Sequence, residues 1–274
     1  MTQTTDIYVI GDYGDHLAFN EVHMRLSAAM EGTNFRFIDQ NVPAFDTVST
    51  GFCLAQLAMN VPSTPEGFAK RTKFFVNTAP RKDDPKARVK CEGEALVYFK
   101  LYNGVEGVVV NSGYSLSFIK EACVEIRAIN IGKEGSQFRS RDIFPIAFGK
   151  LFNDNEDILG ADIKSDIPDY PKDTVVWTDG YGNLKCSLDP DTFNSHMDEH
   201  VKLYINQYPI FGKIAAGIFG VEDGEFCVST GSSGWPLPNG KEVRFVEIIR
   251  RGGNAAETVN FPHSGKKIDW SIVK

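Results

Sequence analysis

The sequence is poor in cysteine, and the few cysteines it has are not grouped for a common task. They are odd in number and scattered, and no two form a C-x-x-C pair; they are Cys53, Cys91, Cys123, Cys186 and Cys227. Disulfide frameworks and cysteine-based zinc sites need regular or close cysteine spacing. The sequence therefore predicts a reduced, cytoplasmic protein without a zinc site built on cysteine.

Long apolar runs and an excess of basic residues are also missing. No stretch reaches the roughly 20 apolar residues of a membrane span, and the first residues lack the basic start and apolar core of a signal peptide. The net charge is −7 and the isoelectric point about 5.3, whereas general nucleic-acid binders are basic. We therefore expect neither a membrane nor a nucleic acid as partner.

Glycine-rich phosphate motifs are absent after the first strand-like run, residues 6–10. The run is followed instead by G-D-Y-G-D at 11–15. In open α/β sheets, ligands bind beyond the carboxyl ends of strands. Asp12 and Asp15 there suit a metal or the hydroxyls of a sugar, but aspartates are also common in plain turns. This stretch alone leaves both interpretations open.

Hydrophobic periodicity predicts an α/β domain over residues 1–156. Strand-like runs lie at 6–10, 34–39, 73–77, 95–102, 106–110 and 124–130, and helical patterns at 18–30, 46–60 and 142–152. Asp46 suits an N-cap, and Pro145 is tolerable in the first turn of its helix. The alternation predicts a mostly parallel sheet between helices.

The pattern changes after this domain. Residues 157–173 are acidic and contain two prolines, which indicates a linker. Short strand-like runs follow at 174–178, 202–205, 213–220, 225–230 and 243–249. Asn239-Gly240 is a strong signal for a tight hairpin. We expect residues 174–274 to form an all-β, antiparallel, barrel-like domain.

One short motif suggests a metal. The stretch H-M-D-E-H at 196–200 has the H-x-x-E-H spacing of inverted zinc peptidases. On a helix, His196 and His200 would share a face, as two ligands of one ion must. A polar surface helix explains the pattern equally well, and no third ligand stands out, so we expect no metal site.

Several weaker motifs gain meaning from their order. They are Gly11-Asp12-Tyr13-Gly14 followed by Asp15, F-I-D-Q-N-V-P-A-F-D at 37–46, F-R-S-R-D-I-F-P at 138–145, D-G-Y-G-N at 179–183, and G-S-S-G-W at 231–235 with F-V-E-I-I-R-R-G-G-N-A-A-E at 245–257. Taken singly, the last three suit a hairpin turn, a glycine-rich bend and a β-bulge. Together they span nearly the whole chain and resemble the S-adenosylmethionine hydroxide adenosyltransferases, hydrolase relatives of the fluorinase and chlorinase enzymes.

The resemblance implies a fold, an assembly and a set of substrate contacts. It implies an α/β N-terminal domain, a C-terminal β-barrel and a homotrimer whose active sites lie between the N-terminal domain of one subunit and the C-terminal domain of a neighbour. By position, Asp12 would hold the ribose hydroxyls, Asp15 would line the methionine side, and Phe45 would lie beside the sugar and sulfonium. In the second domain the amino-acid end would be held by Asp179, Ser232 and Ser233, and the adenine by Tyr181, Asn183, Gly252, Asn254 and Ala255.

The implied reaction is hydrolysis of S-adenosyl-L-methionine to adenosine and L-methionine. Water or hydroxide attacks the ribose C5′ in line, and methionine leaves as a neutral thioether that needs no general acid. The protein then has to align the nucleophile and exclude bulk water. No metal or organic cofactor is implied.

The sequence departs from the family at the nucleophile. Asn77 stands where the hydrolases have an aspartate, Arg139 replaces a histidine, and Ser140 replaces a glycine, as it does in fluorinases. A further family arginine corresponds to Arg81 or Arg88. Asn77, Arg139 and Ser140 are therefore the candidate catalytic residues, with Asn77 able to orient a water but not to act as a base.

These departures keep two alternatives open, a halogenase that uses Ser140 and Arg139, and a protein that binds S-adenosylmethionine or adenosine without turnover. Only thirty residues separate Pro80 from Asn111, which leaves no room for the extra fluorinase loop. A guanidinium about 5 Å from a sulfonium costs roughly 3 kcal/mol at an effective dielectric of 20. Three roles are therefore open for Arg139. It pairs with a carboxylate such as Asp142, it holds an anionic nucleophile, or it only caps or salt-bridges the start of the helix.

Overall fold

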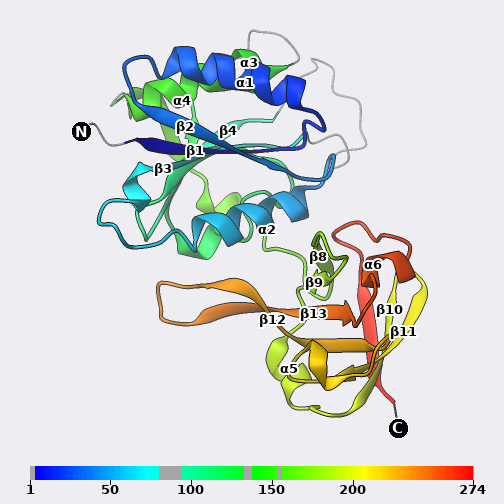
Figure 1. The fold of residues 1–274 in the computed structure, drawn as a ribbon. Helices are drawn as coiled ribbons and strands as arrows, with labels where there is room; N and C mark the ends of the chain where they lie inside the picture. Colours follow the sequence, from blue (N-terminus) through cyan, green and yellow to red (C-terminus); the bar gives the residue numbers. More distant parts are fainter. Residues whose placement is uncertain (1–3, 80–93, 133–137, 154–155, 274) are drawn as a thin grey trace. The chain divides into compact units, whose positions relative to one another are not determined.

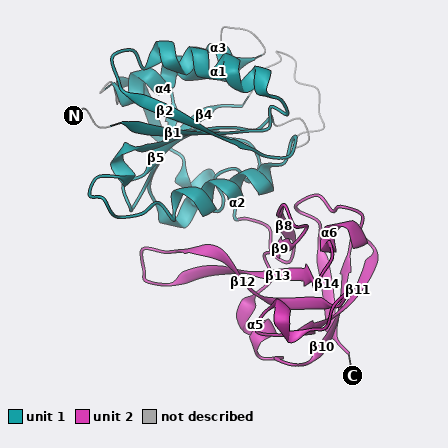
Figure 2. Ribbon diagram, in the orientation of Figure 1, with its two compact units in different colours: residues 1–169 teal, residues 170–274 magenta. Residues whose placement is uncertain are grey.

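A computed structural model describes residues 4–79, 94–132, 138–153 and 156–273 (Figure 1). The chain divides into two compact units, residues 1–169 and 170–274 (Figure 2). Each unit has its own seven-stranded sheet. None of the helices in the described residues combines the length and apolar character that crossing a membrane requires.

The sheet of unit 1 has the strand order β2-β1-β3-β5-β4-β6-β7. Its strands are β1 (Thr5–Gly11), β2 (Phe35–Asn41), β3 (Thr72–Asn77), β4 (Leu96–Leu101), β5 (Glu106–Val110), β6 (Cys123–Ile129) and β7 (Leu159–Asp162). The pairs β1–β2, β1–β3 and β3–β5 are parallel, whereas β4–β5, β4–β6 and β6–β7 are antiparallel. The sheet is therefore mixed.

The prediction of a mostly parallel sheet was wrong, and the connections explain why. A parallel neighbour needs a crossover of a dozen or more residues. Only residues 102–105 separate β4 from β5, in a turn closed by a 2.8 Å hydrogen bond from Leu101 N to Val105 O. The two strands can therefore pair only as an antiparallel hairpin.

Helices cover both faces of this sheet. Figure 1 shows α1 (His16–Ala29), α3 (Arg139–Asp142) and α4 (Phe144–Phe152) on one face and α2 (Thr47–Ala58) on the other. Local signals set two boundaries as predicted, because Asp46 caps α2 by accepting the Ser49 N–H at 2.8 Å and Pro145 lies in the first turn of α4. The described residues of the unit also form four short 3-10 helices, at Ala69–Arg71, Lys120–Ala122, Glu156–Ile158 and Lys164–Asp166.

One hydrophobic core of unit 1 lies between the sheet and the helices α1 and α4. Phe19, Val22 and Leu26 lie three or four residues apart on α1 and are buried against Phe75 of β3 and Phe148 of α4. This spacing places them on one face of the helix. Burial of that face fixes α1 against the sheet and α4.

The predicted linker partly belongs to this unit. Its residues 159–162 form β7, in which Leu159 pairs with Ile129 and Asp162 with Arg127 of β6. The boundary between the units falls after Asp169. The acidic and proline-rich composition around β7 obscured a strand of only four residues.

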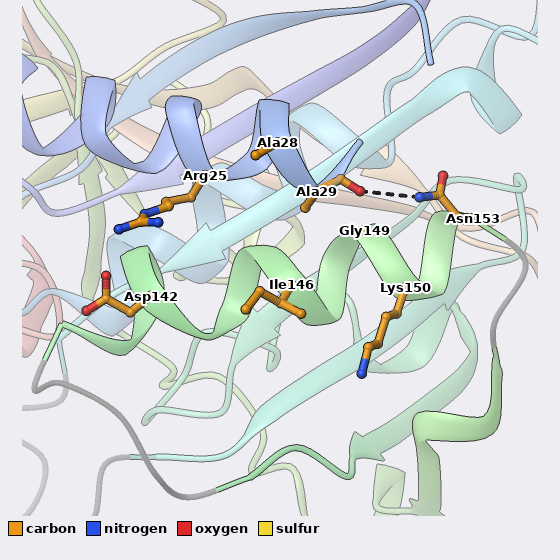
Figure 3. Close-up of a pocket in the computed structure, with 8 residues that line it drawn as sticks. All are labelled: Arg25, Ala28, Ala29, Asp142, Ile146, Gly149, Lys150 and Asn153. Carbon is orange, nitrogen blue, oxygen red and sulfur yellow. Dashed lines mark hydrogen bonds between the residues drawn. The ribbon is translucent and has the colours of Figure 1, made fainter. Parts of the chain in front are cut away.

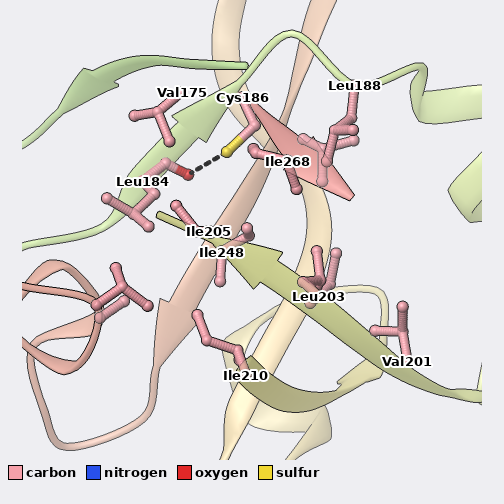
Figure 4. Packing of buried hydrophobic residues seen from close by; sticks show 14 of the residues in the cluster. Val175, Leu184, Cys186, Leu188, Val201, Leu203, Ile205, Ile210, Ile248 and Ile268 are labelled. Carbon is pink, nitrogen blue, oxygen red and sulfur yellow. Dashed lines mark hydrogen bonds between the residues drawn. The ribbon is translucent and has the colours of Figure 1, made fainter. Parts of the chain in front are cut away.

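The sheet of unit 2 has the order β14-β10-β11-β12-β13-β9-β8. Its strands are β8 (Val175–Thr178), β9 (Leu184–Cys186), β10 (His200–Ile205), β11 (Tyr208–Ile214), β12 (Phe226–Pro236), β13 (Glu242–Arg250) and β14 (Ile268–Ile272); its helices are α5 (Pro190–Asn194), a 3-10 turn at Ile218–Gly220 and α6 (Ala255–Thr258). Figure 4 shows its core, in which Leu203, Ile205 and Ile248 pack together. An isolated bridge joins Thr174 to Lys267 near the sheet edges.

The prediction of an antiparallel barrel was also wrong, because this sheet is mixed. Its two edges are linked by backbone hydrogen bonds, from Val175 N to Lys266 O at 3.0 Å and from Ile268 N to Asp173 O at 2.8 Å. Strands β11 and β12 are parallel. The predicted strand 213–220 ends at Ile214. A connection that contains the 3-10 turn then leads to the start of β12 at Phe226. This connection is long enough for β12 to join the sheet in the same direction as β11. With two mixed sheets, the chain as a whole is mostly β.

The hairpin β12–β13 agrees with its turn signal. Asn239-Gly240 lies in its turn, where Gly240 has φ +80° and the Leu237 N–H donates to Lys241 O at 2.7 Å. The G-S-S-G stretch interrupts the ladder between Thr230 and Gly234 as a bulge. Glycine and asparagine favour such backbone conformations.

Candidate functional site

A cavity of about 630 Å³ opens at the carboxyl ends of β1 and β3, beside the start of α3. Five predicted site residues from four separate segments line it; they are Asp12, Phe45, Asn77, Arg139 and Ser140. Parallel strands end at the same sheet edge, so Gly11 and Asn77 are register partners and the residues after them meet there. The cavity is the candidate site of unit 1.

Asp12 ties the loops around this cavity together. Its carboxylate accepts the N–H of Phe45 at 2.9 Å through Oδ2, and the N–H of Ala79 at 3.1 and 3.0 Å through Oδ1 and Oδ2. The Asp12 N–H in turn donates to Asn77 O at 3.3 Å. One side chain thus joins the ends of β1 and β3 to the loop after β2.

Phe45 lies in a conformation that aromatic residues rarely adopt. Its φ is +62°, in the left-handed region. Such a conformation costs about 1–3 kcal/mol and persists only where the surroundings impose it. Two aspartates do so here, because Asp12 accepts the Phe45 N–H and the next residue, Asp46, caps α2. The strained backbone holds Phe45 in the wall of the cavity.

Arg139 and Ser140 begin α3 on another side of the cavity. The Arg139 Nη1 donates to the carbonyl of Glu94 at 3.0 Å, and its guanidinium lies 5.0 Å from the centre of the Phe144 ring. The Ser140 side chain is buried. Glu94, Phe138 and Phe144 also line the cavity.

Arg139 does not pair with Asp142, which was one of the three roles considered for it. Asp142 is held by Arg141, through Nε–Oδ1 and Nη2–Oδ2 contacts of 2.7 and 3.0 Å. The Arg141 Nη1 also donates to Glu21 on α1 at 3.1 Å. Within the described residues, no carboxylate lies at ion-pair distance from Arg139, so no carboxylate at the start of α3 neutralises its charge.

Tyr13 is a cavity residue that sequence reasoning missed. Its hydroxyl is buried and forms no hydrogen bond with a described residue. Burial raises the pKa of this phenol, the neighbouring Ser140 hydroxyl lowers it in part, and the charge of Asp12 raises it. Tyr13 therefore stays protonated at neutral pH. Its position between Asp12 and Gly14 in the first motif is the sequence feature that could have identified it as a site residue.

One further candidate of unit 1, Asp15, lies outside this cavity. Asp15 is the N-cap of α1, where its Oδ1 accepts the Ala18 N–H at 3.0 Å, and it is not among the residues that line the cavity. Arg81 and Arg88 lie outside the described residues.

A second cavity of unit 1 lies in the groove between α1 and α4 (Figure 3) and has a volume of about 480 Å³. Arg25 and Asp142 lie at one end, whereas Lys150 and Asn153 lie at the other. Its polar groups do not converge, and it contains no predicted site residue. The cavity at the strand ends is therefore the better candidate.

The predicted residues of unit 2 gather around two turns. The Asp179 Oδ1 accepts the N–H of Tyr181 at 2.9 Å and of Asn183 at 3.0 Å. This turn contacts the start of α6, because Gly182 O accepts the Ala256 N–H at 2.9 Å and Asn254 lies against Gly182. Asp179, Tyr181, Asn183 and the α6 residues Asn254 and Ala255 are thus neighbours. Tyr181 is 83% exposed, whereas Ala255 is fully buried.

The two predicted serines differ in environment. Ser232 is exposed, whereas Ser233 is buried and donates to Glu247 Oε1 at 3.4 Å. Lys185 joins this group, at 2.7 Å from Glu247 and 3.7 Å from Asp179. Sequence reasoning missed Lys185 and Glu247, although an acid within the apolar run F-V-E-I-I signals a buried charge that needs a partner.

Gly252 occupies a turn that requires glycine. Its φ is +69°, and a Cβ there would lie 2.2 Å from Asp223 Oδ1. The segment R-R-G-G-N-A-A-E is therefore a turn into α6, capped by Asn254, and not the β-bulge considered for it.

The zinc-peptidase pattern fails for a geometric reason. Residues 196–199 form a turn and His200 begins β10, so the two histidines do not share a helix face. The Nδ1 of His196 lies 3.3 Å from Glu199. No group of three or more potential metal-ligating residues occurs in the described part of the chain.

Comparisons with known proteins define the fold alone. No protein-family model and no curated protein matches the chain. Among solved structures, it is similar to an uncharacterized conserved protein from Thermotoga maritima, with a TM-score of 0.67, 20% identity, and coverage of 96% of this chain and 99% of that one. It is also similar to a conserved hypothetical protein from Thermus thermophilus, with a TM-score of 0.61, 16% identity, and coverage of 98% and 100%.

Proposed function

We propose that this chain hydrolyses S-adenosyl-L-methionine to adenosine and L-methionine. The observation that carries the proposal is the convergence of Asp12, Phe45, Asn77, Arg139 and Ser140 on one cavity. These residues lie far apart in the sequence, and the family resemblance assigned each of them by position. Cavities at the carboxyl ends of parallel strands are common ligand sites.

Asp12 retains the capacity to bind a ribose. Its Oδ2 accepts two N–H groups, whereas its Oδ1 accepts only one. A carboxylate oxygen can accept two hydrogen bonds. Oδ1 therefore keeps a lone pair for a ribose hydroxyl, while Phe45 offers its ring to the sugar and the sulfonium.

The proposed reaction is a single displacement. The oxygen of water or hydroxide bonds to C5′, the C5′–S bond breaks with its electron pair going to sulfur, and a proton of the attacking water passes to solvent. The amide of Asn77 and the hydroxyl of Ser140 hydrogen-bond the nucleophile, although neither is a base. The positive charge of Arg139 favours hydroxide there. Positioning and desolvation then lower the barrier.

The contribution of unit 2 and the assembly rest on the resemblance. The amino-acid end of the substrate is assigned to Asp179, Ser232 and Ser233, and the adenine to Tyr181, Asn183, Gly252, Asn254 and Ala255. The same resemblance supports a homotrimer in which neighbouring copies complete each site. Light scattering coupled to size-exclusion chromatography tests the assembly, and a monomer at assay concentration contradicts it.

Product analysis tests the reaction. Purified protein is incubated with S-adenosylmethionine, with and without fluoride or chloride, and the nucleosides are separated by chromatography. We expect adenosine and methionine in equal amounts, no requirement for halide, and no product from Asp12→Ala. The matched control is Asp198→Ala, which removes a 77% exposed aspartate side chain of unit 2.

The other outcomes decide against hydrolysis. A 5′-halo-nucleoside indicates a halogenase. Stabilisation by S-adenosylmethionine or adenosine without product indicates a binding protein that lacks turnover. Adenosine formation that survives in Asp12→Ala removes the ribose assignment.

A further inference from the structure

The arginines of unit 1 show how this chain binds carboxylates. Arg36 holds Asp6 through Nε–Oδ1 and Nη2–Oδ2 contacts of 2.6 and 2.9 Å. Arg141 holds Asp142 through the same two nitrogens at 2.7 and 3.0 Å. The Nε/Nη2 edge of a guanidinium matches the two oxygens of a carboxylate, which makes such pairs both strong and geometrically specific.

In Arg139 this edge has no such partner among the described residues. Its Nη1 is fixed on the Glu94 carbonyl at 3.0 Å, which orients the guanidinium plane. Its Nε is buried and has no hydrogen-bond acceptor in the described part of the chain. A buried donor without an acceptor destabilises the folded protein. An acceptor that reaches this edge recovers that free energy, and the edge is already held in place.

Two hydroxyls lie at the same cavity. The buried Tyr13 hydroxyl also has no partner that meets the geometric hydrogen-bond criterion among the described residues, and the Ser140 hydroxyl lies close enough to lower its pKa. The high pKa of Tyr13 keeps it a donor. Arg139, Tyr13 and Ser140 all line the cavity, and each of these side chains carries a hydrogen-bond donor.

The other walls limit the charge and the shape of the ligand. Asp12 and Glu94 line the same cavity. The Asp12 charge is partly satisfied by N–H groups of Phe45 and Ala79, but a doubly charged anion would still be repelled. The remaining wall is apolar and aromatic, with Phe45, Phe138 and Phe144. This combination suits a single negative charge attached to an apolar body.

We infer that the cavity contains a carboxylate subsite, in which the Nε/Nη2 edge of Arg139 binds a singly charged organic carboxylate and the Tyr13 and Ser140 hydroxyls donate to it. The apolar part of the ligand packs against Phe45, Phe138 and Phe144. This inference goes beyond the proposed hydrolysis and does not rest on it.

Isothermal titration of the full chain with two isosteric ligands tests the inference. Benzoate carries the carboxylate, and benzamide has the same size without the charge. We expect saturable binding of one benzoate per chain, at least tenfold tighter than benzamide, because a charged hydrogen bond contributes about 1.5–3 kcal/mol. Inorganic phosphate and chloride, titrated separately, should bind more weakly than benzoate.

Variants identify the subsite. Arg139→Lys keeps the charge but loses the paired donors, so benzoate affinity should fall about tenfold. Tyr13→Phe removes one donor and should lower the benzoate-to-benzamide ratio about threefold to tenfold. Arg25→Lys is the matched control, because Arg25 lines the groove between α1 and α4 instead, and it should leave both affinities unchanged.

Several results would overturn the subsite. They are equal binding of benzoate and benzamide, tighter binding of phosphate or chloride than of benzoate, and unchanged benzoate affinity in Arg139→Lys. Circular dichroism establishes that each variant is folded. If Arg139→Lys does not fold, the decision passes to Tyr13→Phe, and an unchanged benzoate-to-benzamide ratio in that variant rejects the inference. Because no nucleoside is present, failure here leaves the hydrolase proposal to its own assay.

Discussion

Asp12 illustrates how one residue can build a cavity and still serve a ligand. Its carboxylate holds the backbone of Phe45 and Ala79 in place, and so keeps Phe45 at φ +62°. Removing Asp12 therefore changes the wall of the cavity as well as the proposed ribose contact. Asp12→Asn separates the two effects only in part, because an amide offers one acceptor oxygen where the carboxylate offers two.

Glu106 is a second residue whose partners change its properties, in this case the pKa of its carboxyl group. Its Oε1 lies 3.0 Å from Lys73 Nζ, and its Oε2 accepts the hydroxyl of Tyr98. Burial raises the pKa of Glu106, but the charge of Lys73 and the Tyr98 and Lys73 hydrogen bonds outweigh it, so the pKa is lowered. Burial lowers the pKa of Lys73 more than Glu106 raises it.

The lowered pKa of Glu106 predicts an acid-sensitive contribution to stability. The unfolded chain binds this proton at a higher pH than the folded chain, so the free energy of unfolding falls as the pH drops from the unfolded pKa, about 4.3, through the lower folded pKa. Glu106→Gln should lower stability by about 1–2 kcal/mol at pH 7 and flatten the dependence below pH 5. Urea unfolding at several pH values measures this. Glu121→Gln, at an exposed position, is the control, and an unchanged acid dependence in Glu106→Gln would contradict the assignment.

At the scale of elements, the contact between α1 and α4 depends on one glycine. A Cβ on Gly149 would lie 2.3 Å from Ala29 O and 2.7 Å from Ala29 Cβ. Asn153 closes the same contact by donating to Ala29 O at 3.3 Å (Figure 3). The two helices can therefore approach closely only where α4 has no side chain.

We predict that Gly149→Ala destabilises the protein despite the higher helix propensity of alanine. Propensity favours the change by about 1 kcal/mol, but overpacking against backbone costs about 1–3 kcal/mol or more. The midpoint of urea unfolding should fall. Gly132→Ala is the matched control, since nothing lies within 4 Å of its Cβ position. A Gly149→Ala variant as stable as the parent would show that α4 can shift freely.

Local signals predicted the elements better than their arrangement. The cap at Asp46 and the turn at Asn239-Gly240 depend on a few neighbouring residues, and both are confirmed. Strand direction depends on connections and long-range pairing, so periodicity did not predict the antiparallel β4–β5 pair or the parallel β11–β12 pair.

The candidate site shows the same limit. Its lining by Asp12, Phe45 and Asn77 follows from parallel strands that end at one edge, which sequence patterns can indicate. Which carboxylate an arginine holds depends on side-chain directions within one turn of helix. In the structure, Arg141 binds Asp142, whereas Arg139 lines the cavity.

At the scale of the whole molecule, two of the hydrophobic cores in the described residues belong to different units. One packs residues of unit 1 such as Phe75 and Phe148, and the other packs residues of unit 2 such as Leu203 and Ile248. Each unit thus holds the apolar surface that stabilises its own sheet. A single domain with one core usually unfolds in one cooperative transition. Two units with separate cores can therefore unfold in two separate transitions.

Four buried cysteines among the described residues report on these transitions, two in each unit. They are Cys53 and Cys123 in unit 1 and Cys186 and Cys227 in unit 2. Burial raises the pKa of Cys53 and of Cys123 to about 12, and raises the pKa of Cys186 and Cys227 as well. Because the thiolate is the reactive form, these side chains should resist alkylation at pH 8 until their unit unfolds, when the pKa returns to about 8.5.

Pulse alkylation across a urea gradient, with peptide mapping by mass spectrometry, should therefore give two transitions. We expect Cys53 and Cys123 to become reactive together, and Cys186 and Cys227 together at a different urea concentration. The transition of unit 1 should be the steeper, because the larger unit exposes more surface on unfolding. The native protein at pH 8 is the control for protection. A single midpoint and slope shared by all four cysteines would show that the two units unfold as one, and that contacts between them contribute as much as the separate cores.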